Sequence, residues 1–227
     1  MAKKALIVMA KRPFPGQTKT RLVPPFSPGE AARLYEALLK DTITLARAVP
    51  KVTPFVAYDP ADRDSRAYFQ KIAPDFQLIE QRGSSLGERL DHVLSTGLAL
   101  GYDQVVAMNS DSPTLPVDLL EEAFQRLDDP LTDVVLGPCD DGGYYLIGWK
   151  RPHPRLVREV EMSTEQVLAQ TLRIAAHEQL QAVLLTAWYD VDDLADLQII
   201  ERDLGAADVA VHTRRFLRDS MSKSAKS

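Results

Sequence analysis

The fold of this chain follows from the stretch VVAMNSDSP at residues 105–113 and from a second stretch, AVLLTAWYDVD, at residues 182–192. Each is a short apolar run that ends in aspartate, which predicts a buried parallel strand that delivers a carboxylate to the carboxyl edge of a sheet. Open α/β sheets bind their ligands at this edge. Two such carboxylates can hold one divalent cation, so the two stretches together predict a metal site.

The first 29 residues have the opposite charge. They contain six basic residues and no acidic one, whereas the whole chain has a net charge of -5. A cationic segment combined with a metal site indicates a substrate that is rich in phosphate. The basic residues are Lys3, Lys4, Lys11, Arg12, Lys19 and Arg21.

Size and composition favour one α/β domain. With 227 residues, of which 45% are hydrophobic, the chain can bury a full core, although its length would also permit two small domains. We predict a single domain over residues 1–219 and a polar, disordered tail over residues 220–227.

Composition disfavours several classes of protein. No apolar stretch reaches the roughly 18 residues that a membrane span needs, and the apolar run after Lys4 is too short for a signal peptide, so we expect a cytoplasmic protein that does not bind membranes. A single cysteine, Cys139, and four histidines without H-x-x-x-H spacing disfavour soft-metal sites. The acidic pI, near 5.4, argues against nucleic acid as a partner.

Strand-like and helix-like segments alternate along the chain. This alternation predicts a mostly parallel, twisted sheet with helices on both faces. Ser27, Pro28 and Glu30 form a capping-box signal that starts the first helix, and Pro116 starts a later one. The apolar runs lie at residues 5–10, 52–58, 76–80, 104–108, 133–137, 144–149 and 182–187. Helical periodicity marks residues 28–48, 62–72, 86–100, 116–127, 164–179 and 192–204.

The loop after the first predicted strand comprises residues 11–21 and contains Lys19-Thr20. This pair matches the last two positions of the phosphate-binding loop G-x-x-x-x-G-K-[ST]. Pro13 and Thr18 occupy its two glycine positions, however, so a P-loop NTPase is disfavoured, and the G-x-G-x-x-G dinucleotide fingerprint is missing too. The loop is either a solvated surface or a phosphate-binding segment, and its lack of acids favours the second. The candidate phosphate ligands are Lys11, Arg12, Gly16, Lys19, Thr20 and Arg21.

Three further segments have two interpretations each. Asp140-Asp141-Gly142-Gly143 can be a plain hairpin turn, or an acceptor or sugar site in which an aspartate acts as general base. Ser85 and Gly87 can merely begin a helix, or hold a base, ribose or phosphate at its N-terminus. Ser163 and Thr164 can likewise start a helix or contact the substrate.

The aspartates of the predicted metal site also have structural alternatives. Asp111 can be an Asx-turn residue before Pro113, and Asp190 and Asp192 can cap the helix from residue 193 onward, which can be the only role of Asp192. Asp190 and Asp192 occupy alternate positions of an extended segment, so their side chains should point to the same side and reach one cation.

Five segments, in this order along the chain, resemble the bacterial DUF2064 group of GT-A-type nucleotide-diphospho-sugar transferases, which includes the arsenosugar-type glycosyltransferases. The resemblance extends over residues 5–200. Ser112 and Met162 depart from it, because the group usually has cysteine and tryptophan there. The segments are residues 11–22, 110–113, 140–145, 162–164 and 189–192.

The resemblance implies a GT-A-like fold and a metal-dependent glycosyltransferase with a nucleotide-diphospho-sugar donor and a small-molecule acceptor. It implies Mg²⁺ or Mn²⁺ as cofactor, with Asp111 as the metal-binding acid. The cation and the basic loop would neutralise the departing diphosphate, while Asp140 or Asp141 helps the acceptor attack.

Two other functions remain open at this point. The basic loop is also similar to that of phospholactate guanylyltransferases, so the chain could transfer NMP from an NTP to a phosphorylated small molecule. The third hypothesis is a nucleotide-binding protein without catalytic activity. The presence of both acidic loops speaks against it, since binding alone does not need neutralisation of a leaving group.

Overall fold

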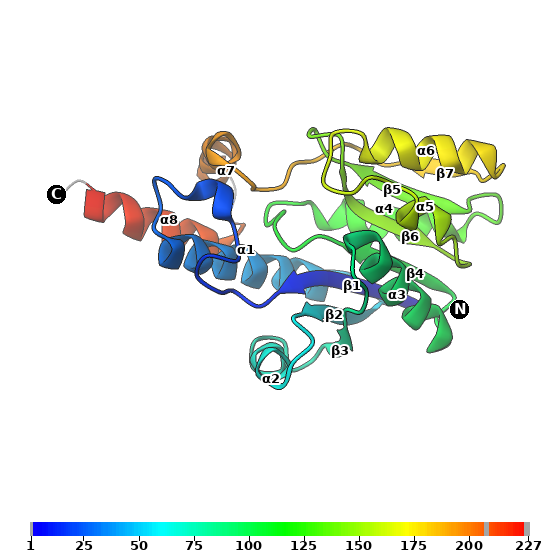
Figure 1. The fold of residues 1–227 in the computed structure, drawn as a ribbon, viewed down its shortest axis with the longest axis horizontal. Helices are drawn as coiled ribbons and strands as arrows, with labels where there is room; N and C mark the ends of the chain where they lie inside the picture. Colours follow the sequence, from blue (N-terminus) through cyan, green and yellow to red (C-terminus); the bar gives the residue numbers. More distant parts are fainter. Residues whose placement is uncertain (1, 207–208, 225–227) are drawn as a thin grey trace.

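The computed structural model describes residues 2–206 and 209–224, which form a seven-stranded sheet covered by helices (Figure 1). None of the described helices is both long and apolar enough to cross a membrane. The strands are β1 (Lys4–Lys11), β2 (Thr53–Asp59), β3 (Gln77–Glu80), β4 (Gln104–Met108), β5 (Val134–Pro138), β6 (Tyr144–Trp149) and β7 (Ala182–Leu184). The helices are α1 (Pro28–Ala48), α2 (Arg63–Ile72), α3 (Leu86–Ala99), α4 (Val117–Asp128), α5 (Arg155–Arg158), α6 (Val167–His177), α7 (Leu194–Ala206) and α8 (Val211–Ser224), with a 3-10 turn, η1 (Thr20–Leu22), before α1.

The order of the strands in the sheet is β3-β2-β1-β4-β6-β5-β7. β6 runs antiparallel to both of its neighbours, and the other pairs of adjacent strands are parallel. The predicted mostly parallel sheet is therefore confirmed. After β3 the chain returns to the other side of β1, so the strand order reverses between β1 and β4. In open α/β sheets, ligands bind in the crevice at such a reversal, outside the carboxyl ends of the strands.

Each face of the sheet has its own apolar layer. On β1, Leu6 and Val8 belong to one buried cluster and Ala5 and Ile7 to another, and all four side chains are fully buried. The first cluster includes side chains of α1, α2 and α4, and the second includes side chains of α3, α5 and α6. Because burying apolar surface contributes about 25 cal/mol per Å², these two layers are the main stabilising element of the fold. Helices on both faces are thus confirmed.

The start of α1 agrees with the sequence signal. Ser27 Oγ accepts a hydrogen bond from the amide of Glu30, the carboxylate of Glu30 accepts one from the amide of Ser27, and Pro28 occupies the first helical turn. Four other helices begin later than expected: α2 at Arg63 and α7 at Leu194, and also α4 and α6. α4 begins at Val117, because Pro116 has an extended backbone and is the N-cap, and α6 begins at Val167.

The last strand is shorter than the apolar run suggested, since β7 ends at Leu184. Beyond it the chain keeps only isolated contacts with the edge of β5. The amide of Leu185 donates to the carbonyl of Leu136 at 2.9 Å, and Trp188 forms a single parallel bridge with Cys139. Figure 1 shows this extended segment running from β7 to α7.

Helix α8 lies beside α1 (Figure 1) and is not predicted by the sequence pattern. Residues 220–224, expected to be part of a disordered tail, are its last residues, which corrects that expectation, while residues 225–227 lie outside the described residues. Asp41 of α1 anchors the start of α8, because its buried carboxylate accepts hydrogen bonds from the amides of His212 and Thr213. Asp41 lies more than 170 residues before α8 in the sequence, so no local sequence pattern could predict this contact.

Candidate active site

Asp111 leaves the carboxyl end of β4 on a loop fixed at both sides. The amide of Asn109 donates to the carbonyl of Tyr145 at 2.9 Å, and Ser110 Oγ lies 2.8 Å from the hydroxyl of Tyr35. Ser112, which follows Asp111, is fully buried and accepts from Asn109 Nδ2 at 3.0 Å. The flanking serines are therefore held inside, and Asp111 is directed to the crevice between β1 and β4.

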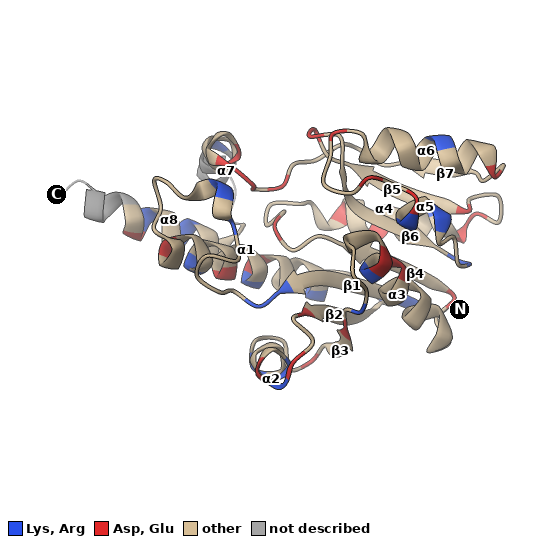
Figure 2. Cartoon of the chain, in the orientation of Figure 1, with Lys and Arg blue, Asp and Glu red and all other residues tan. Residues whose placement is uncertain are grey.

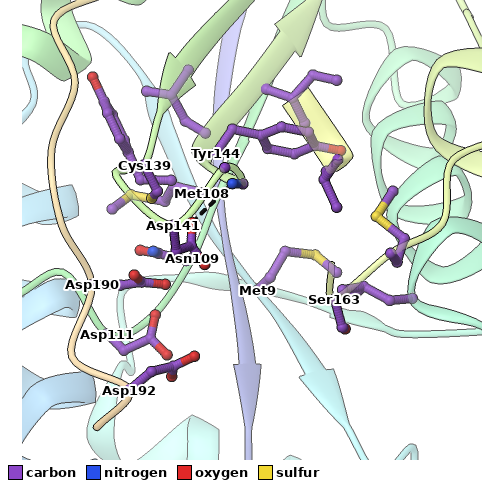
Figure 3. A pocket seen from close by; sticks show the side chains of 18 of the residues that line it. Met9, Met108, Asn109, Asp111, Cys139, Asp141, Tyr144, Ser163, Asp190 and Asp192 are labelled. Atoms are coloured by element: carbon purple, nitrogen blue, oxygen red, sulfur yellow. Dashed lines mark hydrogen bonds between the residues drawn. The ribbon is translucent and has the colours of Figure 1, made fainter. Parts of the chain in front are cut away.

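Asp190 and Asp192 come from the extended segment that follows β7. Val191 between them is fully buried, and its amide donates to the carbonyl of Asp111 at 3.0 Å. Because neighbouring residues of an extended chain point to opposite sides, the two aspartates share the side opposite Val191. Carboxylate oxygens of Asp111, Asp190 and Asp192 lie within 4.8 Å of one another. Figure 3 shows the three side chains gathered on one side of a pocket.

The start of α7 is capped by Asp193, not by Asp192. The Asp193 carboxylate accepts from the amides of Ala195 and Asp196, and the Asp196 carboxylate accepts from the amides of Asp192 and Asp193. The Asp192 carboxylate instead accepts a hydrogen bond from Lys19. The capping alternative for Asp192 is therefore wrong, because the next residue fills that place.

Lys19 joins the two acidic segments. Its backbone has φ of 50°, and its ammonium group lies 2.6 Å from Asp111 Oδ2 and 2.6 Å from Asp192 Oδ1. Burial lowers the pKa of Lys19, but Asp111 and Asp192 raise it, and the net pKa lies above the usual value of a lysine. Arg21 Nη1 lies 3.5 Å from Asp192 Oδ2 on a side chain that is 69% exposed. In Figure 2, acidic positions before α7 lie next to basic positions of the loop after β1.

Asp190 has the least favourable environment of the three carboxyl groups. Burial raises its pKa to about 7, and the negative charges of Asp111 and Asp192 act in the same direction. Lys19, which pairs directly with Asp111 and Asp192, also lowers the pKa of Asp190, but by less than burial and the neighbouring carboxylates raise it. The cluster therefore lacks positive charge near Asp190. Three carboxylates at this spacing offer the hard oxygen ligands that Mg²⁺ and Mn²⁺ prefer, so the residues fit such an ion.

Two adjacent cavities meet at these aspartates. The larger has a volume of about 1050 Å³ and the smaller of about 330 Å³. Both are lined by Asp111 and Asp192. The predicted residues Lys11, Lys19, Thr20 and Arg21 line the smaller one. The predicted residues Asp140, Asp141, Gly142, Gly143, Ser163, Thr164 and Asp190 line the larger one, together with apolar side chains that include Met9 and Tyr144 (Figure 3).

The segment Asp140-Asp141-Gly142-Gly143 is both a hairpin turn and part of the cavity wall. The turn joins β5 to β6, with hydrogen bonds between the backbones of Cys139 and Gly143 and between those of Gly142 and Cys139. Gly142 has φ of +85° and its backbone touches Glu165, so only glycine fits this position. Asp141 Oδ1 accepts from the amide of Gly143 at 2.8 Å, and its carboxylate lies within 4.8 Å of ligand atoms of Cys139 and Asp190. The two interpretations of this segment are thus compatible.

Four candidate residues lie, among the described residues, outside both cavity linings. Arg12 is 3.7 Å from Asp64 of α2, and Gly16 sits in an open stretch of the basic loop with φ of +77°. Ser85 caps α3 by accepting from the amide of Glu88 at 3.1 Å, and the Cα of Gly87 packs closely on the backbone of Val157. The structural alternatives account for Ser85 and Gly87.

Ser163 and Thr164 lie on the connection before α6 and not in the helix. Ser163 has φ of 65°, and Thr164 Oγ1 donates to the carbonyl of Glu161 at 2.8 Å. Both residues line the larger cavity, on the wall opposite the three aspartates in the case of Ser163 (Figure 3). Their position is compatible with contact to a bound ligand.

Tyr35 and Asn109 are site residues that the sequence analysis missed. Tyr35 looks like one more apolar position of α1, but its hydroxyl binds Ser110 and accepts from the amide of Lys11 at 3.0 Å, so it joins the two loops of the site. Asn109 lines both cavities, and its buried Oδ1 has no hydrogen-bond partner among the residues that the structure describes. The position of Asn109 directly after a predicted strand was the available signal.

The sequence profile of one family, described as uncharacterized protein conserved in bacteria (DUF2064), matches residues 42–164, which is more than half of the chain. No curated protein matches the chain in sequence.

Solved structures share the whole fold. A crystal structure from Desulfovibrio desulfuricans G20, provisionally named a nucleotide-diphospho-sugar transferase, is 29% identical, with 98% of this chain and 96% of that chain covered and a TM-score of 0.89. CMP:2-keto-3-deoxy-manno-octonic acid synthetase complexed with CTP is 16% identical, with 90% and 99% covered and a TM-score of 0.59. Glucosyl-3-phosphoglycerate synthase from Mycobacterium tuberculosis, in complex with Mn²⁺, UDP and glucosyl-3-phosphoglycerate, is 12% identical, with 97% and 79% covered and a TM-score of 0.53. The predicted fold class is therefore confirmed.

Proposed function

This chain belongs to the DUF2064 family, and we propose that it is a metal-dependent glycosyltransferase that moves a sugar from a nucleotide-diphospho-sugar to a small-molecule acceptor. One observation carries the proposal. A smaller cavity lined by basic side chains and a larger cavity lined mostly by acidic and apolar side chains meet at Arg21, Asp111 and Asp192, which line both. A nucleotide sugar has the same division, because its diphosphate is anionic and its sugar is uncharged and rich in hydroxyl groups.

The smaller cavity is assigned to the diphosphate. Lys11, Lys19 and Arg21 line it, and Thr18 and Thr20 add hydroxyl groups. Hydrogen bonds from cationic groups to phosphate are about twice as strong as those between neutral groups. These side chains hold the diphosphate and stabilise the negative charge that it gains as it leaves.

The larger cavity is assigned to the sugar and the acceptor. Asp140 or Asp141 accepts the proton of an acceptor hydroxyl group, while the oxygen of that hydroxyl group forms a bond to the anomeric carbon of the sugar. The bond from that carbon to the diphosphate breaks, and a nucleoside diphosphate leaves. Gly142, Gly143, Ser163 and Thr164 line the same cavity and contact the sugar or the acceptor.

Asp111, Asp190 and Asp192 are assigned to hold Mg²⁺ or Mn²⁺. When bound, the ion neutralises charge on the departing diphosphate. The position of the cluster supports this role, because Asp111 and Asp192 stand between the two cavities, where the diphosphate joins the sugar.

Arg21→Ala is expected to weaken the binding of a nucleoside diphosphate about tenfold, because one charge-assisted hydrogen bond to phosphate contributes about 1.5 to 3 kcal/mol. The affinity for the nucleoside without phosphates should stay the same. Calorimetric titration with UDP, GDP and their nucleosides measures both. Arg12→Ala is the matched control, since Arg12 pairs with Asp64 and, of the described residues, is not among those that line either cavity. Equal losses for nucleoside and nucleotide would show that Arg21 only supports the loop.

Nucleotidyl transfer is the second candidate. It is supported by the basic loop between β1 and α1 and by the shared fold with a synthetase whose structure contains CTP. In that reaction a phosphorylated small molecule attacks the α-phosphate of an NTP and pyrophosphate leaves. The two candidates use the same diphosphate and metal positions, and their products tell them apart.

Thermal melting with a panel of nucleotide sugars and NTPs, each with and without Mn²⁺, tests the proposed function. A ligand at about one hundred times its dissociation constant adds roughly 2.7 kcal/mol of stability. We expect nucleotide sugars and Mn²⁺ together to raise the melting temperature more than either does alone. A panel without any nucleotide-dependent shift would contradict a nucleotide-binding site.

A further inference from the structure

We propose that Lys19 blocks the cation site of the nucleotide-free protein, so that the divalent ion binds together with the nucleotide and not before it. The phosphates then take the Lys19 ammonium group away from Asp111 and Asp192. The inference rests on the proposed function for the nature of the phosphate ligand, whereas the block itself involves only residues of this chain.

The geometry of Lys19 carries the first step. Its ammonium group lies 2.6 Å from one oxygen of Asp111 and 2.6 Å from one oxygen of Asp192, and the side chain is only 5% exposed. Two of the three carboxylates that could bind a cation are therefore already engaged by a buried positive charge. An ordinary surface lysine, in contrast, keeps its ammonium group in water.

A divalent ion and this ammonium group compete for the same carboxylates. An ion that bound Asp111, Asp190 and Asp192 while Lys19 stayed in place would have a positive charge within a few ångströms, and like charges at this separation repel each other. Among the described residues no ion pair involves Asp190, so its carboxylate alone is left for an ion, and one carboxylate without substrate phosphates is a poor site for Mg²⁺ or Mn²⁺. The nucleotide-free protein should therefore bind these ions weakly.

The place to which Lys19 can move is part of the structure. Lys19 also lines the smaller cavity, beside Lys11, Thr20 and Arg21, which is the compartment assigned to the diphosphate. A lysine side chain has a flexible four-carbon stem, so a change of rotamer redirects its ammonium group without movement of the backbone. Phosphate oxygens in that cavity offer the ammonium group replacement partners of the same charge as the carboxylates.

This exchange makes ion and nucleotide binding cooperative. Each ligand removes what hinders the other, because the phosphates take the ammonium group and the ion takes the freed carboxylates. Thermodynamic linkage requires the nucleotide to raise the affinity for the ion by the same factor by which the ion raises the affinity for the nucleotide. Simple additive binding would leave both affinities unchanged.

The first test measures Mn²⁺ binding without any nucleotide, by electron paramagnetic resonance of the free ion at pH 8. Lys19→Met is expected to bind Mn²⁺ at least about tenfold more tightly than the wild type, because it frees two carboxylates and removes a positive charge. Arg12→Met is the control of equal charge change, and its affinity for Mn²⁺ should match that of the wild type. Unchanged or weaker binding by Lys19→Met would overturn the proposal, and so would equal tightening in both variants.

If Lys19→Met does not fold, Lys19→Gln serves in its place, because its side chain is also neutral but still donates a hydrogen bond to one carboxylate. The second measurement adds saturating UDP or GDP. In the wild type either nucleotide that binds should raise the Mn²⁺ affinity at least about fivefold. In the variant this factor should be smaller, because the ion and the diphosphate still attract each other but no lysine has to leave the carboxylates. Equal coupling in both proteins overturns the block. If neither nucleotide binds either protein, the proposed function fails, and the block is judged by Mn²⁺ alone.

Discussion

Asp190→Asn is expected to lower Mn²⁺-dependent turnover of a nucleotide sugar about a thousandfold, which corresponds to roughly 4 kcal/mol of lost transition-state stabilisation. The reason is that Asp190 is the carboxylate of the cluster that Lys19 does not bind directly. An amide in its place is a weaker, uncharged ligand. Release of the nucleoside diphosphate measures the turnover.

The same substitution should not lower the stability of the folded protein. Burial and the neighbouring charges of Asp111 and Asp192 raise the pKa of Asp190 to about 7, so its ionised form is less stable in the folded than in the unfolded protein. As the pH rises from the usual pKa of an aspartate to about 7, ionisation of Asp190 lowers the free energy of unfolding. This loss is complete at pH 8. At that pH, Asp190→Asn should therefore melt no lower than the wild type. In the presence of a nucleotide, Mn²⁺ should raise the melting temperature of the wild type but not that of the variant.

Asp193→Asn is the matched control for Asp190→Asn. It removes a carboxylate from the same segment, but Asp193 caps α7 and asparagine caps helices about equally well. Turnover and the response to Mn²⁺ should stay close to those of the wild type. Asp190→Asn turnover within about tenfold of the wild type would contradict the assignment of Asp190 as a metal ligand.

Gly142→Ala is expected to lower the free energy of unfolding by about 3 kcal/mol and to lower turnover as well. Gly142 has φ of +85°, and a Cβ atom there would collide with the backbone carbonyl of Glu165. Relief of this collision must move the turn that carries Asp140 and Asp141 or the connection before α6. Urea denaturation measures the loss of stability.

Gly101→Ala separates strain from collision. Gly101 has φ of +86°, almost the same as Gly142, but a Cβ atom there would meet no other atom within 4 Å. Its substitution should therefore cost only the conformational strain, about 1 kcal/mol, and leave turnover unchanged. Equal losses of stability in the two variants would show that the contact between Gly142 and Glu165 is not tight.

The strands could be predicted well because the signal for each is local. All seven apolar runs became strands, and the capping box at Ser27 starts α1 as expected. The antiparallel direction of β6 follows from the short turn that joins it to β5, which the sequence analysis recognised as a hairpin alternative. Helix α8 was not predicted, because Asp41, which binds its first turn, lies in α1.

The candidate site was predicted only in part, because only some of its residues have a local signal in the sequence. Asp111 and Asp190 each follow an apolar run, and the resemblance to the DUF2064 group pointed to the same residues, so their position near one another was expected. The ion pairs of Lys19 were not, because Asp111 and Asp192 lie 92 and 173 residues away. The sequence analysis assigned Lys19 to phosphate, whereas the structure shows it bound to carboxylates. Local charge patterns do not specify which of two anionic partners a lysine binds.

Glycosyl transfer breaks the bond between the anomeric carbon of the sugar and the diphosphate, whereas nucleotidyl transfer breaks a bond to phosphorus. The most direct measurement incubates the protein and Mn²⁺ with a panel of nucleotide sugars and, separately, with NTPs and a pool of phosphorylated metabolites. It assays nucleoside diphosphate and pyrophosphate in each mixture. We expect slow release of UDP or GDP from a nucleotide sugar even without the true acceptor, because water can enter an open cavity and attack in its place. Release of pyrophosphate from an NTP, without nucleoside diphosphate from any nucleotide sugar, would contradict glycosyl transfer and establish nucleotidyl transfer.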